Sequence, residues 1–286
     1  MTPSMLALLT IVPGILAAQP RGPLFLVGGG PQPDSLVSEF VQLAGGAGHA
    51  RIVVMAMASA SGETSGEAKA AELRTLGAQA VNLWLTHDQA DSDSAARLLD
   101  GATGIWFGGG DQNRLMEAIG GTQVAAAVVA RWQAGAVIGG TSAGAAVAST
   151  PMITGDERRP GGVRADTSQA WITIDRDNVL TARGLGLLTE VIVDQHFVRR
   201  RRHNRLLSLV LEGPVRLGAG IDESTALIVE SDGTWRVSGA SVVVVFDARR
   251  ATGPSQPTPL GGSGILTHVL PAGSRFNPAT GLATLP

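Results

Sequence analysis

One short segment constrains the fold more than any other: Gly-Gly-Thr-Ser-Ala-Gly-Ala at 139–145, directly after the apolar run 134–138. A buried strand that ends in Gly-x-Ser-x-Gly and turns at once into a small-residue helix is typical of a nucleophile elbow. Glycines flank the serine because larger side chains would collide where the strand turns back against the helix. The segment predicts an α/β sheet that holds Ser142 open at a strand end. The free N–H groups of a helix from Ala143 to Ala148 would face the same spot.

The rest of the chain alternates between apolar runs and helical stretches. Strands are expected at 24–27, 51–58, 80–85 and 104–107, and helices at 35–44, 68–76, 92–99, 112–119 and 123–133. This alternation predicts a doubly wound, mostly parallel sheet with helices on both faces. Short runs of period two at 225–230, 234–238 and 241–246 predict an antiparallel C-terminal extension. No composition break or linker interrupts 22–286, so we expect a single domain there.

A serine nucleophile needs a base, and the base needs an orienting group. Of the five histidines, His196 follows a convincing buried strand at 188–193. A later apolar run at 215–221 leads in the same way to Glu223. Because strand ends of an open α/β sheet share the ligand-binding edge, Ser142, His196 and Glu223 are expected to meet there. A core or capping histidine and a solvated turn carboxylate are the alternatives for the last two.

A run of arginines at 199–202, with a further one at 205, begins three residues after the predicted base. A net charge of −2 and the lack of a second basic tract argue against a nucleic-acid partner. On a helix, Arg202 and Arg205 would share one face, and guanidinium groups bind carboxylates in a bidentate way. We therefore expect a carboxylate-rich acyl substrate such as an aspartyl peptide. A plain solvated surface is the alternative.

Several classes of site are not expected. The chain has no cysteine and no His-Glu-x-x-His segment, so we predict no metal site. The turn at 28–30 lacks the spacing of a dinucleotide fingerprint, so we predict no cofactor. The apolar segment 5–18 is too short to span a bilayer but has the length of a signal-peptide core. Residues 1–18 thus predict a signal peptide and export to the periplasm or the exterior. A buried N-terminal segment of a cytoplasmic protein is the alternative.

Five blocks of the sequence together resemble the successive blocks of the cyanophycinase family. They are Gly108–Leu115, Gly140–Ala145, Gly184–Leu188, Asp194–Phe197 and Gly220–Glu223. Cyanophycinases are serine peptidases related to the aspartyl dipeptidases and built on a class I amidotransferase-like sheet. The resemblance runs from about Leu24 to about Ala279. The segment 155–162 matches no block.

The resemblance implies roles for particular residues. Ser142 would be the nucleophile, His196 the general base and Glu223 the third member of a triad. The oxyanion would be met by backbone N–H groups near Gly109 or Gly110 and at Ala143. The remaining positions implied for the substrate pocket are Gln112, Asp194, Gln195, Arg200, Arg202 and Arg205. Arg199 and Arg201 do not match and are expected on the surface, while Asp194 would meet a guanidinium of the substrate.

The implied reaction is the release of β-Asp-Arg dipeptides from cyanophycin, a polyaspartate with arginine on each β-carboxyl group. A homodimer is also expected from the resemblance. An aspartyl or isoaspartyl dipeptidase acting on short peptides is the rival enzyme. An α/β-hydrolase esterase fits less well, because in that family the acid precedes the histidine. A binding domain that kept the serine turn without activity is the non-enzymatic alternative.

Overall fold

The computed structural model describes residues 21–159, 161–165, 170–253 and 260–286. The predicted signal peptide at 1–18 therefore lies outside the described residues. Within the described ranges, no helix combines the length and the apolar character needed to cross a membrane.

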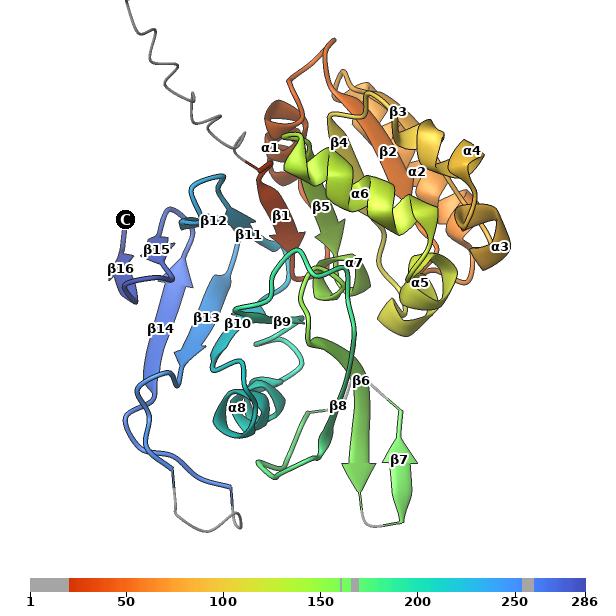
Figure 1. Ribbon diagram of the computed structural model, residues 1–286. Coiled ribbons are helices and arrows are strands. Elements are labelled where there is room, and N and C mark those ends of the chain that lie inside the picture. The colour runs from red at the N-terminus through yellow and green to blue at the C-terminus, as the bar shows by residue number, and fades with distance from the viewer. Residues whose placement is uncertain (1–20, 160, 166–169, 254–259) are drawn as a thin grey trace, which may run out of the picture.

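A nine-stranded sheet forms the centre of the molecule (Figure 1). Its parallel half has the order β1 (Leu24–Val27), β5 (Val137–Thr141), β4 (Gly104–Phe107), β2 (Arg51–Met55) and β3 (Gln79–Asn82). Its antiparallel half continues from β1 through β11 (Thr225–Val229), β12 (Trp235–Gly239), β15 (Arg275–Asn277) and β16 (Leu282–Thr284). The predicted fold class, a mostly parallel α/β sheet with an antiparallel extension, is confirmed.

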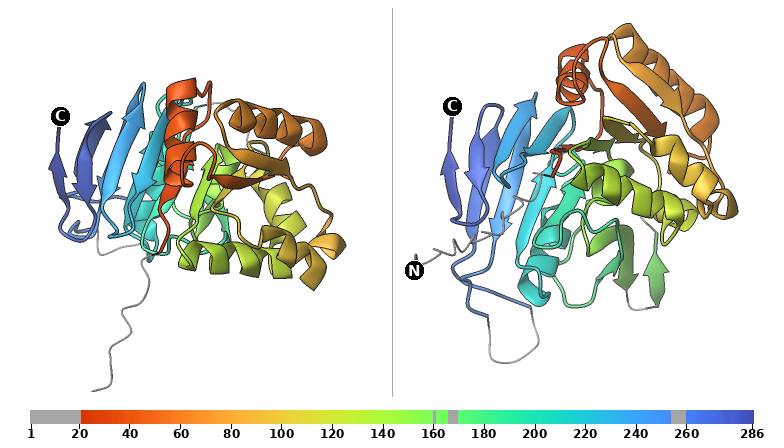
Figure 2. Two further views of the ribbon diagram at one scale, coloured as in Figure 1. Left: turned by 90° about the horizontal axis from the view of Figure 1, so that it is seen from above. Right: turned by 45° about the horizontal axis from the view of Figure 1, so that its top comes forward.

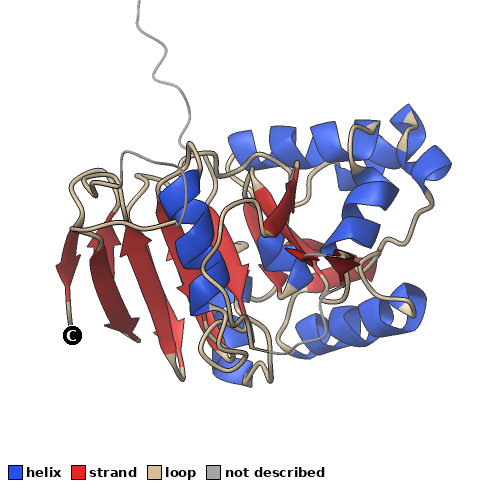
Figure 3. Ribbon diagram, turned by 90° about the horizontal axis from the view of Figure 1, so that it is seen from below, coloured by secondary structure: helices blue, strands red, loops and turns tan. Residues whose placement is uncertain are grey.

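Helices cover both faces of the parallel half (Figures 2 and 3). On one face lie α1 (Asp34–Leu43) and α2 (Gly62–Thr75). On the other lie α3 (His87–Ala90), α4 (Asp93–Ala96), α5 (Gln112–Ile119) and α6 (Gln123–Gln133). The predicted helix at 92–99 is shorter, since α4 gives way to a 3₁₀ turn at Arg97–Leu99.

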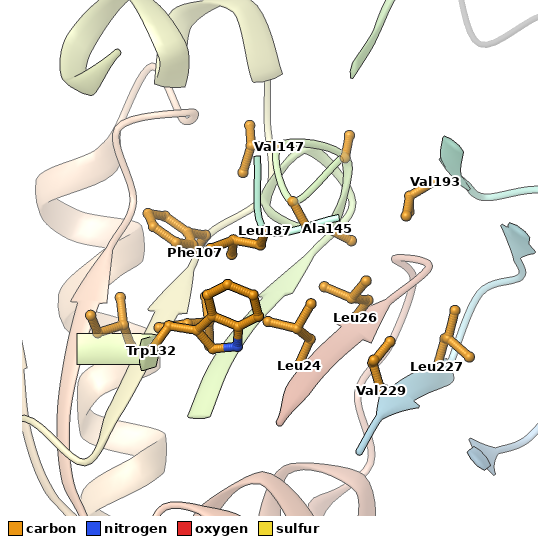
Figure 4. Packing of buried hydrophobic residues seen from close by; sticks show 14 of the residues in the cluster. Leu24, Leu26, Phe107, Trp132, Ala145, Val147, Leu187, Val193, Leu227 and Val229 are labelled. Carbon is orange, nitrogen blue, oxygen red and sulfur yellow. The ribbon is translucent and has the colours of Figure 1, made fainter. Parts of the chain in front are cut away.

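Alternation along the strands explains why both faces are covered. In β1, Phe25 and Val27 belong to the core under α1 and α2, whereas Leu24 and Leu26 belong to the opposite core with Trp132 of α6. Figure 4 shows Leu24 and Leu26 in this second core. A strand buried on both faces is apolar at every position, which is why these strands read as continuous runs.

A second sheet has the order β14 (Leu266–Pro271), β13 (Val242–Asp247), β10 (Leu217–Ile221) and β9 (Ile192–Gln195). One face is covered by α8 (His203–Glu212), which can approach closely because β10 carries glycines. A Cβ atom at Gly218 would lie 2.8 Å from Leu206 of α8, and one at Gly220 would lie 2.3 Å from Phe197.

This second sheet corrects two expectations. The strands predicted to deliver His196 and Glu223 do not extend the parallel sheet, because β10 pairs with β9 and β13 rather than with β1. The strand expected at 188–193 is also displaced to Ile192–Gln195. Asp194 and Gln195 therefore lie inside a buried strand rather than beyond its end.

A third, three-stranded sheet was not anticipated. It has the order β7 (Gly162–Arg164), β6 (Met152–Arg159) and β8 (Val179–Ala182), and it extends at the bottom of the molecule in Figure 1. Its strand β6 contains residues 155–159 of the segment that matched no block of the family, and β7 begins at Gly162.

Candidate active site

Ser142 lies in a sharp turn between β5 and the short helix α7 (Ala143–Ala146). Its backbone has φ 54° and ψ −113°, a conformation that non-glycine residues rarely adopt. Strained conformations of this kind are concentrated at functional sites. Both neighbouring glycines are needed. A Cβ atom at Gly140 would lie 2.5 Å from the carbonyl oxygen of Gly144, and one at Gly144 would lie 2.3 Å from that of Phe107. The predicted strand–turn–helix around Ser142 is present, with a helix shorter than expected.

His196 follows β9 directly and brings its ring to the serine. Its Nε2 lies 2.9 Å from the Oγ of Ser142, and its Nδ1 lies 2.6 Å from Oε1 of Glu223. Glu223 stands in the turn that connects β10 with β11. The structure thus brings together the three residues that the sequence predicted to meet, although Ser142 follows the main sheet and His196 the second one.

The surroundings of His196 keep its imidazole neutral. Burial is the largest effect and lowers the pKa of His196 below its ordinary value of 6.5, since a buried cation loses its hydration. The hydrogen bond to Glu223 raises this pKa, while the nearby cations Arg200 and Arg202 lower it further. A neutral imidazole with Nε2 on the serine hydroxyl can accept a proton, and a carboxylate on Nδ1 holds the required tautomer.

The turn Gly28–Gly29–Gly30 after β1 encloses the imidazole and the carboxylate. A Cβ atom at Gly29 (φ +103°) would lie 2.2 Å from Cε1 of His196. At Gly30 it would lie 2.7 Å from Cβ of Glu223. The backbone also binds directly, because the N–H of His196 donates to the carbonyl of Gly28 at 2.6 Å. This role of the turn was not predicted from the sequence, where three consecutive glycines at a strand end were the available signal.

Two backbone N–H groups next to Ser142 are open. A Cβ atom at Gly109 would lie 3.5 Å from Cβ of Ser142, so this glycine packs against the serine. Among the described residues, the structure gives the N–H groups of Gly109 and Ala143 no acceptor. The N–H of Gly110 has no acceptor among the described residues either, but this glycine packs against Ala58, whose carbonyl oxygen would be 2.2 Å from its Cβ, and not against Ser142. Gly109 and Ala143 are therefore the better placed of the three predicted oxyanion donors.

Of the other residues predicted to line the pocket, all but Arg200 are buried. Asp194, Arg202 and Arg205 are each 1% exposed. Arg205 binds the carboxylate of Asp194 through Nε at 2.8 Å and a terminal nitrogen at 2.5 Å. Arg202 donates to the backbone and side-chain oxygens of Gln195. In the structure, Asp194, Arg202 and Arg205 bind partners inside the protein, and their predicted contact with a substrate stays a prediction. Their burial follows from the position of Asp194 within β9.

Gln195 and Gln112 connect the site to its support. Oε1 of Gln195 accepts from Arg202 and lies 3.4 Å from the hydroxyl of Ser142. Nε2 of Gln112 donates to the carbonyls of Ile153 and Thr154, which ties α5 to β6. Both side chains are nearly buried.

Arg200 is the predicted pocket residue that is not fully buried. Its side chain is half-buried, and its charge acts on His196. Within the described part of the chain, its guanidinium has neither an ion pair nor a hydrogen bond. Arg199 and Arg201 are exposed, as the sequence suggested. Arg200 is thus the arginine of the run that remains available to a ligand beside the triad.

Among the described residues, no three His, Cys, Asp or Glu side chains lie so that they could hold a metal ion. The site instead has the composition of a covalent hydrolase: hydroxyl, imidazole, carboxylate and open N–H donors.

Comparison with known proteins places the chain in a class. The model of peptidase family S51 matches residues 24–237, so the chain belongs to this family of serine peptidases.

Its relatives are more specific. The chain is 36% identical to the cyanophycinase of Synechococcus elongatus over 217 residues, which are 75% of this chain and 63% of that protein. It is 31% identical to the cyanophycinase of Geminocystis herdmanii over 253 residues, covering 86% of this chain and 88% of that one. Among solved structures, a peptidase from an acI-B1 Actinobacterium aligns with a TM-score of 0.60 at 22% identity, covering 87% of this chain and 97% of the other. The alignment with the Synechococcus protein thus spans less than two thirds of that relative.

Proposed function

We propose that this protein is a serine exopeptidase that hydrolyses cyanophycin to β-Asp-Arg dipeptides. The observation that carries the proposal is the continuous contact from Ser142 through His196 to Glu223, with distances of 2.9 Å and 2.6 Å. The cyanophycinase relatives support the choice of substrate.

In the first half of the reaction, Nε2 of His196 takes the proton of Ser142, and Oγ attacks a backbone carbonyl carbon. The oxyanion is stabilised by the N–H groups of Gly109 and Ala143, a contribution of about 3–4 kcal/mol per donor. His196 then gives its proton to the leaving amine as the C–N bond breaks, and an ester on Ser142 remains. Glu223 stabilises the imidazolium that exists between these two transfers.

In the second half, water attacks the ester while His196 takes one of its protons. The C–O bond to Ser142 breaks, the serine regains its proton, and the carboxylic acid leaves. No further reactant is needed, so the residues in contact suffice for the complete cycle.

Arg200 supports an acidic substrate. Its guanidinium is free of protein partners among the described residues and lies beside His196. A substrate carboxylate can bind it in a bidentate way, which would orient the polymer end above the serine.

The test is incubation with purified cyanophycin followed by mass spectrometry of the soluble products. The expected product has the mass of β-Asp-Arg, and S142A, in which the nucleophile is lost, should release none. R201Q is the control substitution and should cleave as the wild type does, because Arg201 is exposed and is not part of the proposed site. Turnover of free aspartyl or isoaspartyl dipeptides with an intact polymer would favour the rival dipeptidase. No labelling of Ser142 by a fluorophosphonate and no cleavage of either substrate would favour the binding domain.

A further inference from the structure

Three polar side chains run from α2 to the residue before the nucleophile and have no part in the mechanism above. Nζ of Lys69 donates to Oε1 of Gln32 at 3.0 Å. Nε2 of Gln32 donates to Oγ1 of Thr141 at 3.1 Å. Lys69 belongs to α2, Gln32 to the loop after β1, and Thr141 is the last residue of β5.

The chemistry of these groups determines the direction of every hydrogen bond. An ammonium group only donates, so the atom of Gln32 that faces Lys69 must be its oxygen. The amide nitrogen therefore faces Thr141, and the hydroxyl oxygen of Thr141 must accept. Its own hydrogen is left to donate elsewhere. Across the described ranges, the structure gives that O–H no acceptor.

Lys69 is itself held in place, so the direction is stable. It forms an ion pair with Glu72 at 2.6 Å and lies 5.2 Å from the centre of the Trp106 ring. Its side chain is 16% exposed, and it is the chain's only lysine.

The residue that carries this O–H group is adjacent to the nucleophile. Thr141 directly precedes Ser142, and its Cγ2 lies 3.7 Å from where a Cβ atom of Gly109 would be. Its hydroxyl is bound by the loop after β1, and its methyl group faces the loop after β4. Strands β1 and β4 pair with β5 on either side, so Thr141 lies between the two loops that flank the nucleophile.

We infer that Thr141 binds substrate, donating its hydroxyl hydrogen to a carbonyl or carboxylate oxygen of the residue that becomes the acyl group. Gln32 and Lys69 are positioning residues that keep this hydroxyl a donor toward the substrate. The inference rests on the proposed function and extends it, because a donor here favours an acidic acyl residue.

The test compares kcat/KM on cyanophycin, and on aspartyl dipeptides, with the rate at which a fluorophosphonate labels Ser142. T141V removes the hydroxyl at nearly constant volume. We expect kcat/KM to fall about 10-fold, mainly through KM, while labelling stays within about twofold, because the probe carries no acyl residue. T141S should recover most of the loss. In K69M, kcat/KM should fall about threefold. In K69R it should not fall, since arginine still donates to Gln32.

T189V is the matched control and should keep the wild-type kcat/KM. Thr189 is exposed and lines a pocket near the first residues of β1, at the end of the strand away from the active site. Wild-type kcat/KM in T141V would overturn the inference. If T141V does not fold, unchanged kcat/KM in both Q32M and K69M would overturn it. Failure of the proposed function would be visible in the wild type, which would cleave neither substrate, and the inference would fall with it.

Discussion

Replacing Gly29 by alanine tests whether the glycine turn after β1 positions the catalytic imidazole. Gly29 has φ +103°, so alanine there carries a backbone strain of about 1–2 kcal/mol. The new Cβ would also lie 2.2 Å from Cε1 of His196, whereas carbon atoms rest at about 3.5–4.0 Å. The ring must therefore move by more than about 1 Å, and a displacement of that size costs about 100-fold in rate.

Gly135 provides the matched control. Its φ of +98° is nearly the same, but a Cβ atom there would meet nothing within 4 Å. Both G29A and G135A should lower the melting temperature by roughly 2–8 °C, at about 2–4 °C for each kcal/mol.

Only G29A should slow the labelling of Ser142 by a fluorophosphonate and the cleavage of cyanophycin, by about 100-fold. Circular dichroism at the assay temperature establishes that both variants are folded. Wild-type labelling in a folded G29A would refute the reasoning, because it would mean that the backbone of the turn moves to relieve the contact while the ring of His196 stays in place.

Four further results are expected. R200M should raise the pKa of His196 toward 6.5, which moves the acid limb of kcat/KM to higher pH; an unmoved limb would show that Arg200 does not act on the base. The lowered pKa of His196 also means that the unfolding free energy declines as pH falls below 6.5. D194N removes the carboxylate that Arg205 binds and should cost about 3–5 kcal/mol in urea unfolding; a change under about 1 kcal/mol would show that the buried pair of Asp194 and Arg205 does not support the fold. T122A removes the hydroxyl that caps α6 and should cost about 1 kcal/mol in the same assay, with wild-type cleavage.

Much of the fold could be predicted because strong local signals agreed with the tertiary structure. The predicted bounds at 104–107, 112–119 and 123–133 are those of β4, α5 and α6. Glycine, aspartate or threonine stands at both ends of β4 and α5 and at the start of α6, and these residues end strands or cap helices. The meeting of Ser142, His196 and Glu223 followed from one general rule about strand ends.

The outer part of the third sheet could not be predicted because a buried ion pair lies there, beyond the apolar Met152 and Ile153 at the start of β6. In β6, Glu157 is 1% exposed and accepts hydrogen bonds from Arg159 and Arg164, both at 2.6 Å. An ion pair between neighbouring strands leaves no apolar alternation in the sequence.

The burial of Arg202 and Arg205 was hidden for a related reason. A run of arginines has the composition of a surface, and only the pairing with Asp194 and Gln195 takes these charges out of water. These partners lie only seven to eleven residues earlier on β9, but the turn that folds the arginines back onto this strand has no signature in the sequence.

The division of the triad between two sheets gives the active site a mechanical dependence. Ser142 travels with the main sheet and His196 with the second one, so hydrolysis requires that the two layers stay in register to within a fraction of an ångström. The peptide that links β10 to β11 carries Glu223 across the boundary and joins the layers covalently at that point. A displacement of one sheet relative to the other would break the contact between His196 and Ser142 and abolish hydrolysis, while the strand pairing within each sheet stayed intact.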